Sequence, residues 1–268
     1  MLSGLAPARR RLVLSLVAAV VVTLLAGVGV LVAGRLTADQ APPVSQETPG
    51  PVLLVPGYGG GQGALQALAE LLRSQGRDAT IVTVPGNGTG DLADTAEALD
   101  EAADAALART GADSVDVVGY SAGGVVARVW VADGGADVAR RVVTLGSPHH
   151  GTTLADLAGD VAPSQCPVGC TQLGTTSDLL ARLNARDETP DGPTWVSIWT
   201  EQDQTVTPPD SARLEGALNI AVQDVCRGAR VGHGDLPSNP VVQAMVVAEL
   251  RAGDPVAPTQ AVCTGLGG

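Results

Sequence analysis

Three polar residues have the types and the chain order that catalysis by a hydroxyl nucleophile requires. Ser121, the first, stands in the segment GYSAG (119–123), after a short β-branched run at 114–118 and before apolar residues that recur on one helical face. This context predicts a sharp strand-to-helix turn whose strained backbone exposes the serine hydroxyl. The flanking glycines let the strand and the helix approach each other closely. A glycine-rich turn with an incidental serine is the alternative.

The second residue is the base that a serine hydroxyl needs before it becomes a good nucleophile, and this base must itself be oriented by an acid. The sequence contains three histidines. When the nucleophile lies on a strand-to-helix turn, the acid follows it and the histidine comes last. His233 leaves room for an acid after Ser121, whereas His149 and His150 leave little. We therefore predict His233 as the base, and His149 and His150 as wall or structural residues.

The third residue is the acid that orients the base. Asp203 follows the strand-like run 194–199 in the segment TEQDQTVTP, at the edge where the site of a parallel sheet lies. Its competitors are Asp210, Asp224 and Glu201. Asp224 lies close to His233 in the chain, and Asp203 rather than Glu201 lies at the tip of the loop. We predict Asp203.

Acyl transfer also needs preorganised N–H donors for the developing oxyanion. Ala122 follows the nucleophile at the amino end of a helix, where the helix dipole favours negative charge, so we predict its N–H as one donor. Glycines in VPGYGGG (55–61) allow the backbone N–H of Tyr58 to turn inward as the second. The alternative for this segment is a phosphate-binding loop, but it lacks the P-loop lysine and the spacing of the dinucleotide fingerprint.

These residues need a scaffold that brings several strand ends to one edge. Strand-like and helical runs alternate along the chain, which predicts an α/β fold: a mostly parallel sheet with right-handed crossovers and helices on both faces. The segment 149–193 breaks the alternation, and it is either a cap over the site or a plain surface excursion. The expected strands are 52–55, 79–84, 114–118, 141–145, 194–199 and 217–222, and the expected helices are 62–75, 91–109, the segment after Ser121, 177–186 and 239–251.

The amino-terminal region is expected to lie outside the catalytic domain. Residues 12–34 carry no charge and are long enough to cross a bilayer core of about 30 Å; three arginines precede them and one follows. We expect 1–11 to be a basic cytoplasmic end, 12–34 a transmembrane signal anchor or a cleaved signal peptide, and 35–50 a proline-rich linker. Residues 51–268 then form one extracytoplasmic domain of ordinary size.

Four cysteines all fall in the region expected outside the cytoplasm. An oxidising compartment favours disulfides, and four cysteines allow three pairings. Cys166 and Cys170 close the short loop CPVGC, so we predict a local bond there and a second bond from Cys226 to Cys263 that ties down the carboxyl-terminal tail. A four-cysteine zinc site is the alternative, but Cys226 and Cys263 lack the close spacing of zinc ligands.

The net charge of the chain indicates which kinds of partner to expect. The formal net charge is −12, and no basic cluster follows Arg35, which argues against nucleic acid as a partner. We predict neither a metal nor a cofactor, and we expect a monomer whose contact with the membrane is made by residues 12–34.

Several segments in a fixed order carry a family resemblance: LLVPGYGG, VVGYSAGG, TLGSPHHGT, WTEQDQTVTP and the late GH. Together, over about 52–250, they resemble the bacterial (actinobacterial-type) secreted lipases and esterases of the α/β-hydrolase superfamily. The sequence departs from many relatives in having proline rather than histidine at position 56. The resemblance implies an α/β-hydrolase fold without a cofactor, with Ser121 as nucleophile, Asp203 as acid, His233 as base, and Tyr58 and Ala122 as oxyanion donors.

The resemblance also implies a substrate class, namely lipid or other acyl esters. An acyltransferase is the first alternative, since it differs only in which acceptor reaches the acyl-enzyme. A catalytically silent binding module on the same fold is the second; such proteins usually lose a member of the catalytic triad, and this sequence holds candidates for all three.

Overall fold

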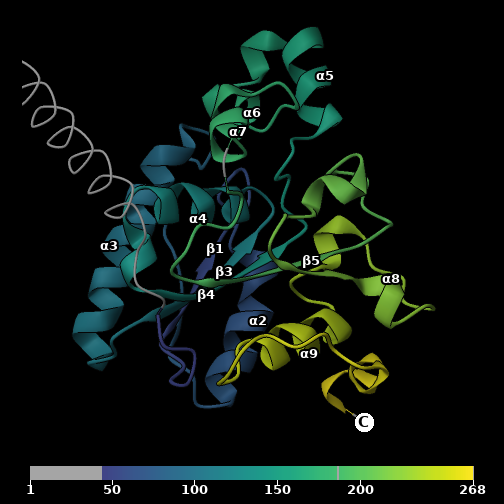
Figure 1. Cartoon of the computed structure of the whole chain (residues 1–268). Helices are drawn as coiled ribbons and strands as arrows, with labels where there is room; N and C mark the ends of the chain where they lie inside the picture. The colour runs from purple at the N-terminus through teal and green to yellow at the C-terminus, as the bar shows by residue number, and fades with distance from the viewer. Residues whose placement is uncertain (1–43, 186, 268) are drawn as a thin grey trace, which may run out of the picture. The chain divides into compact units, whose positions relative to one another are not determined.

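A six-stranded parallel sheet forms the centre of the computed structural model, which describes residues 44–185 and 187–267 (Figure 1). The strand order is β2-β1-β3-β4-β5-β6, and every neighbouring pair is parallel. The predicted parallel sheet is thus confirmed. Its strands are β1 (Val52–Val55), β2 (Ala79–Ile81), β3 (Val115–Tyr120), β4 (Ala139–Leu145), β5 (Thr194–Trp199) and β6 (Leu218–Ala221).

Helices cover both faces of this sheet, as the alternating pattern predicts (Figure 1). In β1, Leu53 and Val55 belong to one core cluster, and Val52 and Leu54 belong to the other. Successive side chains of a strand point to opposite faces, so a strand covered on both faces is apolar throughout. The helices of the first cluster are α3 (Leu92–Thr110) and α4 (Ala122–Ala132), and those of the second are α2 (Gly63–Ser74) and α9 (Pro240–Glu249).

The direction of chain winding reverses between β1 and β3, which lie side by side in the sheet. From β1 the chain moves outward to β2, and from β3 it moves the other way through β4, β5 and β6. In open parallel sheets, ligands bind beyond the carboxyl ends of the strands at such a reversal. The loop that contains Tyr58 follows β1 and Ser121 follows β3, so both lie at this point.

The segment between β4 and β5 forms a cap, which we define as residues 151–184. It contains three short α-helices, and Figure 1 shows them gathered at one end of the described structure. Only the last was predicted, although Thr152 caps the first by accepting a hydrogen bond from the N–H of Leu154. A threonine is a favoured residue at the N-cap position, so the sequence did indicate where this helix begins. The helices are α5 (Thr153–Val161), α6 (Val168–Thr171) and α7 (Asp178–Leu183).

Short helical segments complete the part of the chain that the structure describes. Each follows a strand or lies in a loop. They are the four-residue α-helix α8 (Val222–Val225) and the 3-10 helices η1 (Gly135–Asp137), η2 (Pro163–Gln165), η3 (Pro209–Ala212), η4 (His233–Asp235) and η5 (Gln260–Gly267).

A buried ion-pair cluster ties the amino ends of the strands to the end of α9. Asp116, the one charged residue inside the apolar run of β3, is fully buried and accepts hydrogen bonds at 2.6–2.7 Å from Arg77 and Arg140. Arg140 also donates to the backbone oxygen of Leu250 at 3.0 Å. Buried charges are tolerated only when paired in this way. The cluster stabilises the end of the sheet opposite to the predicted site residues.

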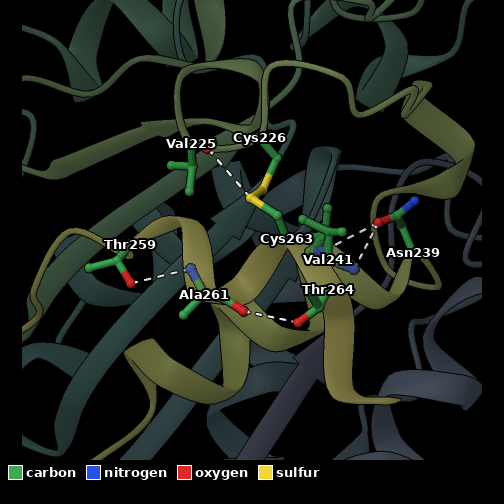
Figure 2. The surroundings of a disulfide bond; sticks show 9 residues. Val225, Cys226, Asn239, Val241, Thr259, Ala261, Cys263 and Thr264 are labelled. Atoms are coloured by element: carbon green, nitrogen blue, oxygen red, sulfur yellow. Dashed lines mark hydrogen bonds between the residues drawn. A yellow bond between two sulfur atoms is a disulfide. The ribbon is translucent and has the colours of Figure 1, made fainter. Parts of the chain in front are cut away.

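The four cysteines form the two predicted pairs. The sulfur atoms lie 1.97 Å apart in Cys166–Cys170 and 1.94 Å apart in Cys226–Cys263, so the cysteines are not arranged as a zinc site. Figure 2 shows Cys263, on η5, joined to Cys226, which directly follows α8. The carboxyl-terminal tail is therefore linked covalently to the segment that precedes His233.

We expect the two disulfides to differ in their effect on stability. Chain entropy predicts about 4 kcal/mol for the 37-residue separation of Cys226 and Cys263 and about 2 kcal/mol for the four-residue separation of Cys166 and Cys170. The paired variants Cys226→Ser/Cys263→Ser and Cys166→Ser/Cys170→Ser serve as controls for each other in urea unfolding followed by tryptophan fluorescence. An equal loss of unfolding free energy in both would contradict the expectation.

The predictions for residues 1–11 and 12–34, and for most of the linker at 35–50, lie outside the described residues. Across 44–185 and 187–267, no helix combines the length and the apolar composition that crossing a bilayer requires.

Candidate active site

Ser121 lies on the sharp turn between β3 and α4 that the sequence predicts. Its φ of 53° is the one positive value among the non-glycine residues that the structure describes. Such backbone conformations are strained and cluster at functional sites. A Cβ added at Gly119 would lie 2.6 Å from the carbonyl carbon of Gly123, and one added at Gly123 would lie 2.3 Å from the oxygen of Val55. Both glycines are therefore required for the strand and the helix to approach this closely.

The structure brings the three residues predicted for catalysis into one chain of hydrogen bonds. The distance from Ser121 Oγ to His233 Nε2 is 3.0 Å, and that from His233 Nδ1 to Asp203 Oδ2 is 2.7 Å. The second oxygen of Asp203 accepts the backbone N–H groups of Thr205 and Val206, each at 2.8 Å. These contacts fix the carboxylate, which in turn fixes the imidazole. Asp210, Asp224 and Glu201 form no hydrogen bond with His233 in the described structure.

The loops that contain Asp203 and His233 are also held to each other, through contacts that the sequence did not reveal. Thr200 Oγ1 donates to the oxygen of Val231 at 2.7 Å, and the side-chain oxygen of Gln202 accepts the N–H of Val231 at 3.1 Å. These two hydrogen bonds join the loop of the acid to the loop of the base.

Tyr120 packs against the ring of His233 and binds its backbone. The two rings lie 5.2 Å apart, and the Tyr120 hydroxyl donates to the backbone oxygen of His233 at 3.3 Å. Burial, followed by the charges of Asp203 and Asp235, raises the pKa of Tyr120 to about 12. The hydroxyl therefore keeps its proton and remains a donor at neutral pH.

The loop after β1 passes directly beside Ser121. A Cβ added at Gly57 would lie 3.0 Å from Ser121 Cβ, and the loop is held by a 2.9 Å hydrogen bond from the N–H of Gly59 to the oxygen of Gly88. The backbone N–H groups of Tyr58 and Ala122 have no acceptor in the part of the chain that the structure describes. They are thus free to bind an anion at Ser121, and their assignment as oxyanion donors stays a prediction.

A cavity of about 260 Å³ opens beside Ser121. Most of its wall is apolar and comes from the cap and from the loop after Asp203. Among the residues that line it are Tyr58, Pro148, Thr152, Leu154, Ala155, Ala158, Cys170, Leu173 and Val206. The cap therefore contributes to the cavity wall, and this part of the segment 149–193 is not a plain surface excursion.

The other two histidines lie outside the hydrogen-bonded chain of Ser121, His233 and Asp203. His150 is 43% exposed and pairs with Glu188 at 2.8 Å. His149 is fully buried, and its Nε2 lies 3.1 Å from the hydroxyl of Thr144, which donates its own proton to Ser197. Thr144 must then accept from His149, so Nε2 carries the proton. Neither histidine forms a hydrogen bond with Ser121 or lines the cavity, which favours the structural role over the wall role for both.

We expect His149 to make the fold sensitive to acid. Burial, reinforced by the charges of Arg128 and His150, holds the pKa of His149 well below its usual 6.5. Below pH 6.5 the unfolded chain binds a proton that the native chain does not, so stability falls as pH falls, by about 1.4 kcal/mol per pH unit for one proton. His149→Gln should lack this component. Urea unfolding of both proteins at pH 7.5 and 5.5 tests this, and parallel pH dependences would contradict it.

No group of three or more histidine, cysteine, aspartate or glutamate side chains in residues 44–185 and 187–267 is arranged to hold a metal ion.

Comparison with known proteins supports the same fold. Residues 50–165 match the family described as alpha/beta hydrolase fold. The crystal structure of Aspergillus fumigatus lipase B superposes with a TM-score of 0.66 at 20% identity, over 81% of this chain and 56% of that one. Mature Bacillus licheniformis lipase BlEst2 gives a TM-score of 0.55 at 21% identity, over 68% of this chain and 87% of that one. This chain thus spans little more than half the length of the Aspergillus lipase.

The family match over residues 50–165, the strand order and the turn at Ser121 all indicate the same fold. The protein has the α/β-hydrolase fold, as the sequence motifs predicted. The similarity to the two lipases, at about one residue in five, is a similarity of fold.

Proposed function

We propose that the protein is a serine hydrolase that cleaves carboxylic esters through an acyl-enzyme on Ser121. The observation that carries this proposal is the hydrogen-bonded chain from Asp203 through His233 to Ser121, on a turn whose backbone is strained at the serine. A nucleophile, a base and an orienting acid within hydrogen-bond reach are the parts that acyl transfer by serine requires.

The reaction follows from this geometry. Ser121 Oγ attacks the ester carbonyl carbon while His233 Nε2 takes the hydroxyl proton, and Asp203 stabilises the imidazolium. The N–H groups of Ala122 and Tyr58 stabilise the oxyanion. The tetrahedral intermediate then breaks its bond to the alcohol oxygen, which receives the proton from His233. Water attacks the acyl-enzyme, gives its proton to the same nitrogen, and the acid leaves as Ser121 is reprotonated.

Apolar side chains around the cavity favour a lipid-like acyl ester as the substrate. Soluble proteins rarely gather exposed apolar residues in one place without a functional reason. Among the described residues, all the exposed large apolar side chains except Val256 lie in the loop after β1 or in the cap: Tyr58, Leu154, Leu157, Val161 and Val168. The similarity to structures named lipases agrees with this substrate class.

We also propose where the protein acts. Two disulfides suit an oxidising compartment, so the catalytic domain belongs outside the cytoplasm. Residues 12–34 would anchor it as a monomer in the membrane, or would release it if they are cleaved. The resemblance to bacterial secreted lipases and esterases stays a prediction.

The decisive experiment detects the acyl-enzyme. We expect full-length protein in detergent to release a burst of p-nitrophenol from p-nitrophenyl butyrate, and a fluorophosphonate to label Ser121, as shown by peptide mass spectrometry. Glycerol added as an acceptor separates the hydrolase from an acyltransferase, because only the latter would accumulate glyceryl butyrate. The absence of both burst and label would overturn the proposal in favour of a silent binding module.

Gly146 has an unpredicted role in this site, and its substitution should impair hydrolysis. Its φ is 55°, and an added Cβ would lie 2.5 Å from Leu236 Cδ1, 3.2 Å from Asp203 Oδ2 and 3.3 Å from His233 Nδ1. Gly146→Ala must push the end of Leu236 aside and shift the acid–base pair by a few tenths of an ångström, less than the misplacement of about 1 Å that costs on the order of 100-fold in rate. We expect kcat to fall by up to roughly 10-fold.

Gly76→Ala is the matched control for Gly146→Ala. Gly76 has a φ of 81°, and an added Cβ would meet nothing within 4 Å. The control therefore carries the strain of an alanine in the left-handed region, about 1–2 kcal/mol, without a clash at the site. If both variants lose the same stability and neither loses kcat, the role of Gly146 is structural only.

A further inference from the structure

The cavity beside Ser121 has a closed side and an open side. Cys170, Leu173 and Val206 are buried where they line it, whereas Tyr58 and Leu154 are 41% and 47% exposed. A ligand attached to Ser121 would therefore enter between Tyr58 and Leu154 and end against buried apolar side chains.

The helix α5 forms one wall of the cavity with small side chains. Ala155 and Ala158 line the cavity, whereas Leu157 and Val161 of the same helix do not line it and are 58% and 74% exposed. Leu154, which also lines the cavity, and Ala155 precede Ala158 by four and three residues, as expected for one face of a helix. Two methyl groups thus stand where larger side chains would occupy the cavity.

Several contacts fix this wall. Thr152 Oγ1 donates to the oxygen of Thr205 at 2.7 Å, and the hydroxyls of Thr153 and Thr207 lie 2.7 Å apart, so the start of α5 is tied to the loop after Asp203. A Cβ added at Gly159 would lie 3.9 Å from the sulfur of Cys166, so the Cys166–Cys170 disulfide lies against the same helix. The wall is held at both ends, which gives the cavity a defined size.

We infer that this cavity holds the acyl chain and that Ala155, Ala158 and Leu173 limit it to about six to eight carbons; the inference builds on the proposed ester hydrolysis. Taking about 30 Å³ per non-hydrogen atom, the share of a water molecule in the liquid, 260 Å³ holds about eight or nine atoms. The volume also lies below the range of about 300–1,000 Å³ that is usual for drug-sized ligands. Short- and medium-chain esters, rather than long-chain ones, are then the substrates.

A series of p-nitrophenyl esters from acetate to palmitate, assayed with the full-length protein, tests the limit. Each methylene that becomes buried is expected to raise kcat/KM by about fourfold. We expect kcat/KM to rise up to the hexanoate or octanoate and to level off or fall from the decanoate onward. A continued rise to palmitate would overturn the inference.

Variants in the wall should move this limit in opposite directions. Ala158→Phe fills the cavity, so the ratio of kcat/KM for octanoate to that for acetate should fall by more than about tenfold, the equivalent of two methylenes. Leu173→Ala removes three side-chain carbons, and the preferred chain should lengthen by about two to four carbons. The two variants do not share a folding defect, because Ala158 is partly exposed whereas Leu173 is buried.

Leu157→Phe is the matched control, since it adds an aromatic ring at a position of the same helix that is 58% exposed and does not line the cavity. Its chain-length profile should equal that of the wild type. Unchanged profiles in Ala158→Phe and Leu173→Ala, or an equal shift in Leu157→Phe, would overturn the assigned wall. Failure of the proposed function looks different, because no ester of any length would then be cleaved.

Discussion

Ser121→Ala is expected to lower kcat for p-nitrophenyl butyrate by at least about 10⁴-fold, with little change in the folded structure. Alanine retains the Cβ, so the packing of the turn between β3 and α4 is preserved and only Oγ, 3.0 Å from His233 Nε2, is lost. Some hydrolysis above the rate in water should persist, because the proposed oxyanion donors and the cavity remain. Steady-state kinetics and circular dichroism of the purified variant give both readouts.

Ser147→Ala is the control for this variant. Ser147 is fully buried at the same edge of the sheet, and its hydroxyl has no hydrogen-bond partner within the described residues. Its loss should leave kcat within a few-fold of the wild type, since the hydroxyl belongs to neither the hydrogen-bonded chain nor the cavity wall. If Ser121→Ala turned over esters as fast as Ser147→Ala does, the proposed nucleophile would be wrong.

His233→Ala should reduce kcat about as severely as Ser121→Ala does, because no other base among the described residues lies within hydrogen-bond reach of Oγ. The double variant Ser121→Ala/His233→Ala should be little worse than either single variant, since nucleophile and base act as a unit. Multiplicative losses in the double variant would show that the two residues act independently, against the mechanism.

His150→Ala is the matched histidine control, because His150 is exposed and paired with Glu188 outside the hydrogen-bonded chain. We expect its kcat to remain near that of the wild type in the same assay. If His149→Gln lost turnover as Ser121→Ala does while His233→Ala stayed active, the base would be assigned to the wrong histidine.

Much of the scaffold could be predicted because local sequence patterns encode local structure. The apolar run of β3, the glycines at 119 and 123 and the helical spacing after Ser121 specify a strand, a tight turn and a helix within a few residues of each other. The same locality explains the Cys166–Cys170 pair, whose residues lie four apart. In these cases the interacting groups are neighbours in the chain, so a short window contains the whole signal.

Other features depend on segments that meet only in the folded protein. The helix α5 was not predicted although Thr152 caps it, because it has no buried residue and so presents a weak apolar pattern. The contacts of Thr200 and Gln202 with Val231 join loops about 30 residues apart, and the sequence of neither loop indicates which segment it will contact. The cavity likewise combines residues from the loop after β1, the cap and the loop after β5.

The sequence by itself determined which residue types are present, their order and the turn that exposes Ser121. Only the tertiary structure decided that Ser121, Asp203 and His233 lie within hydrogen-bond distance, since Ser121 and His233 are 112 residues apart. Their meeting depends on the strand order β3-β4-β5-β6, which brings the ends of β3 and β5 to either side of β4. The residue directly after β4 must then leave room between them, and Gly146 does so because it has no side chain. Strand order arises from the burial of apolar faces across the whole sheet, so no local segment encodes it.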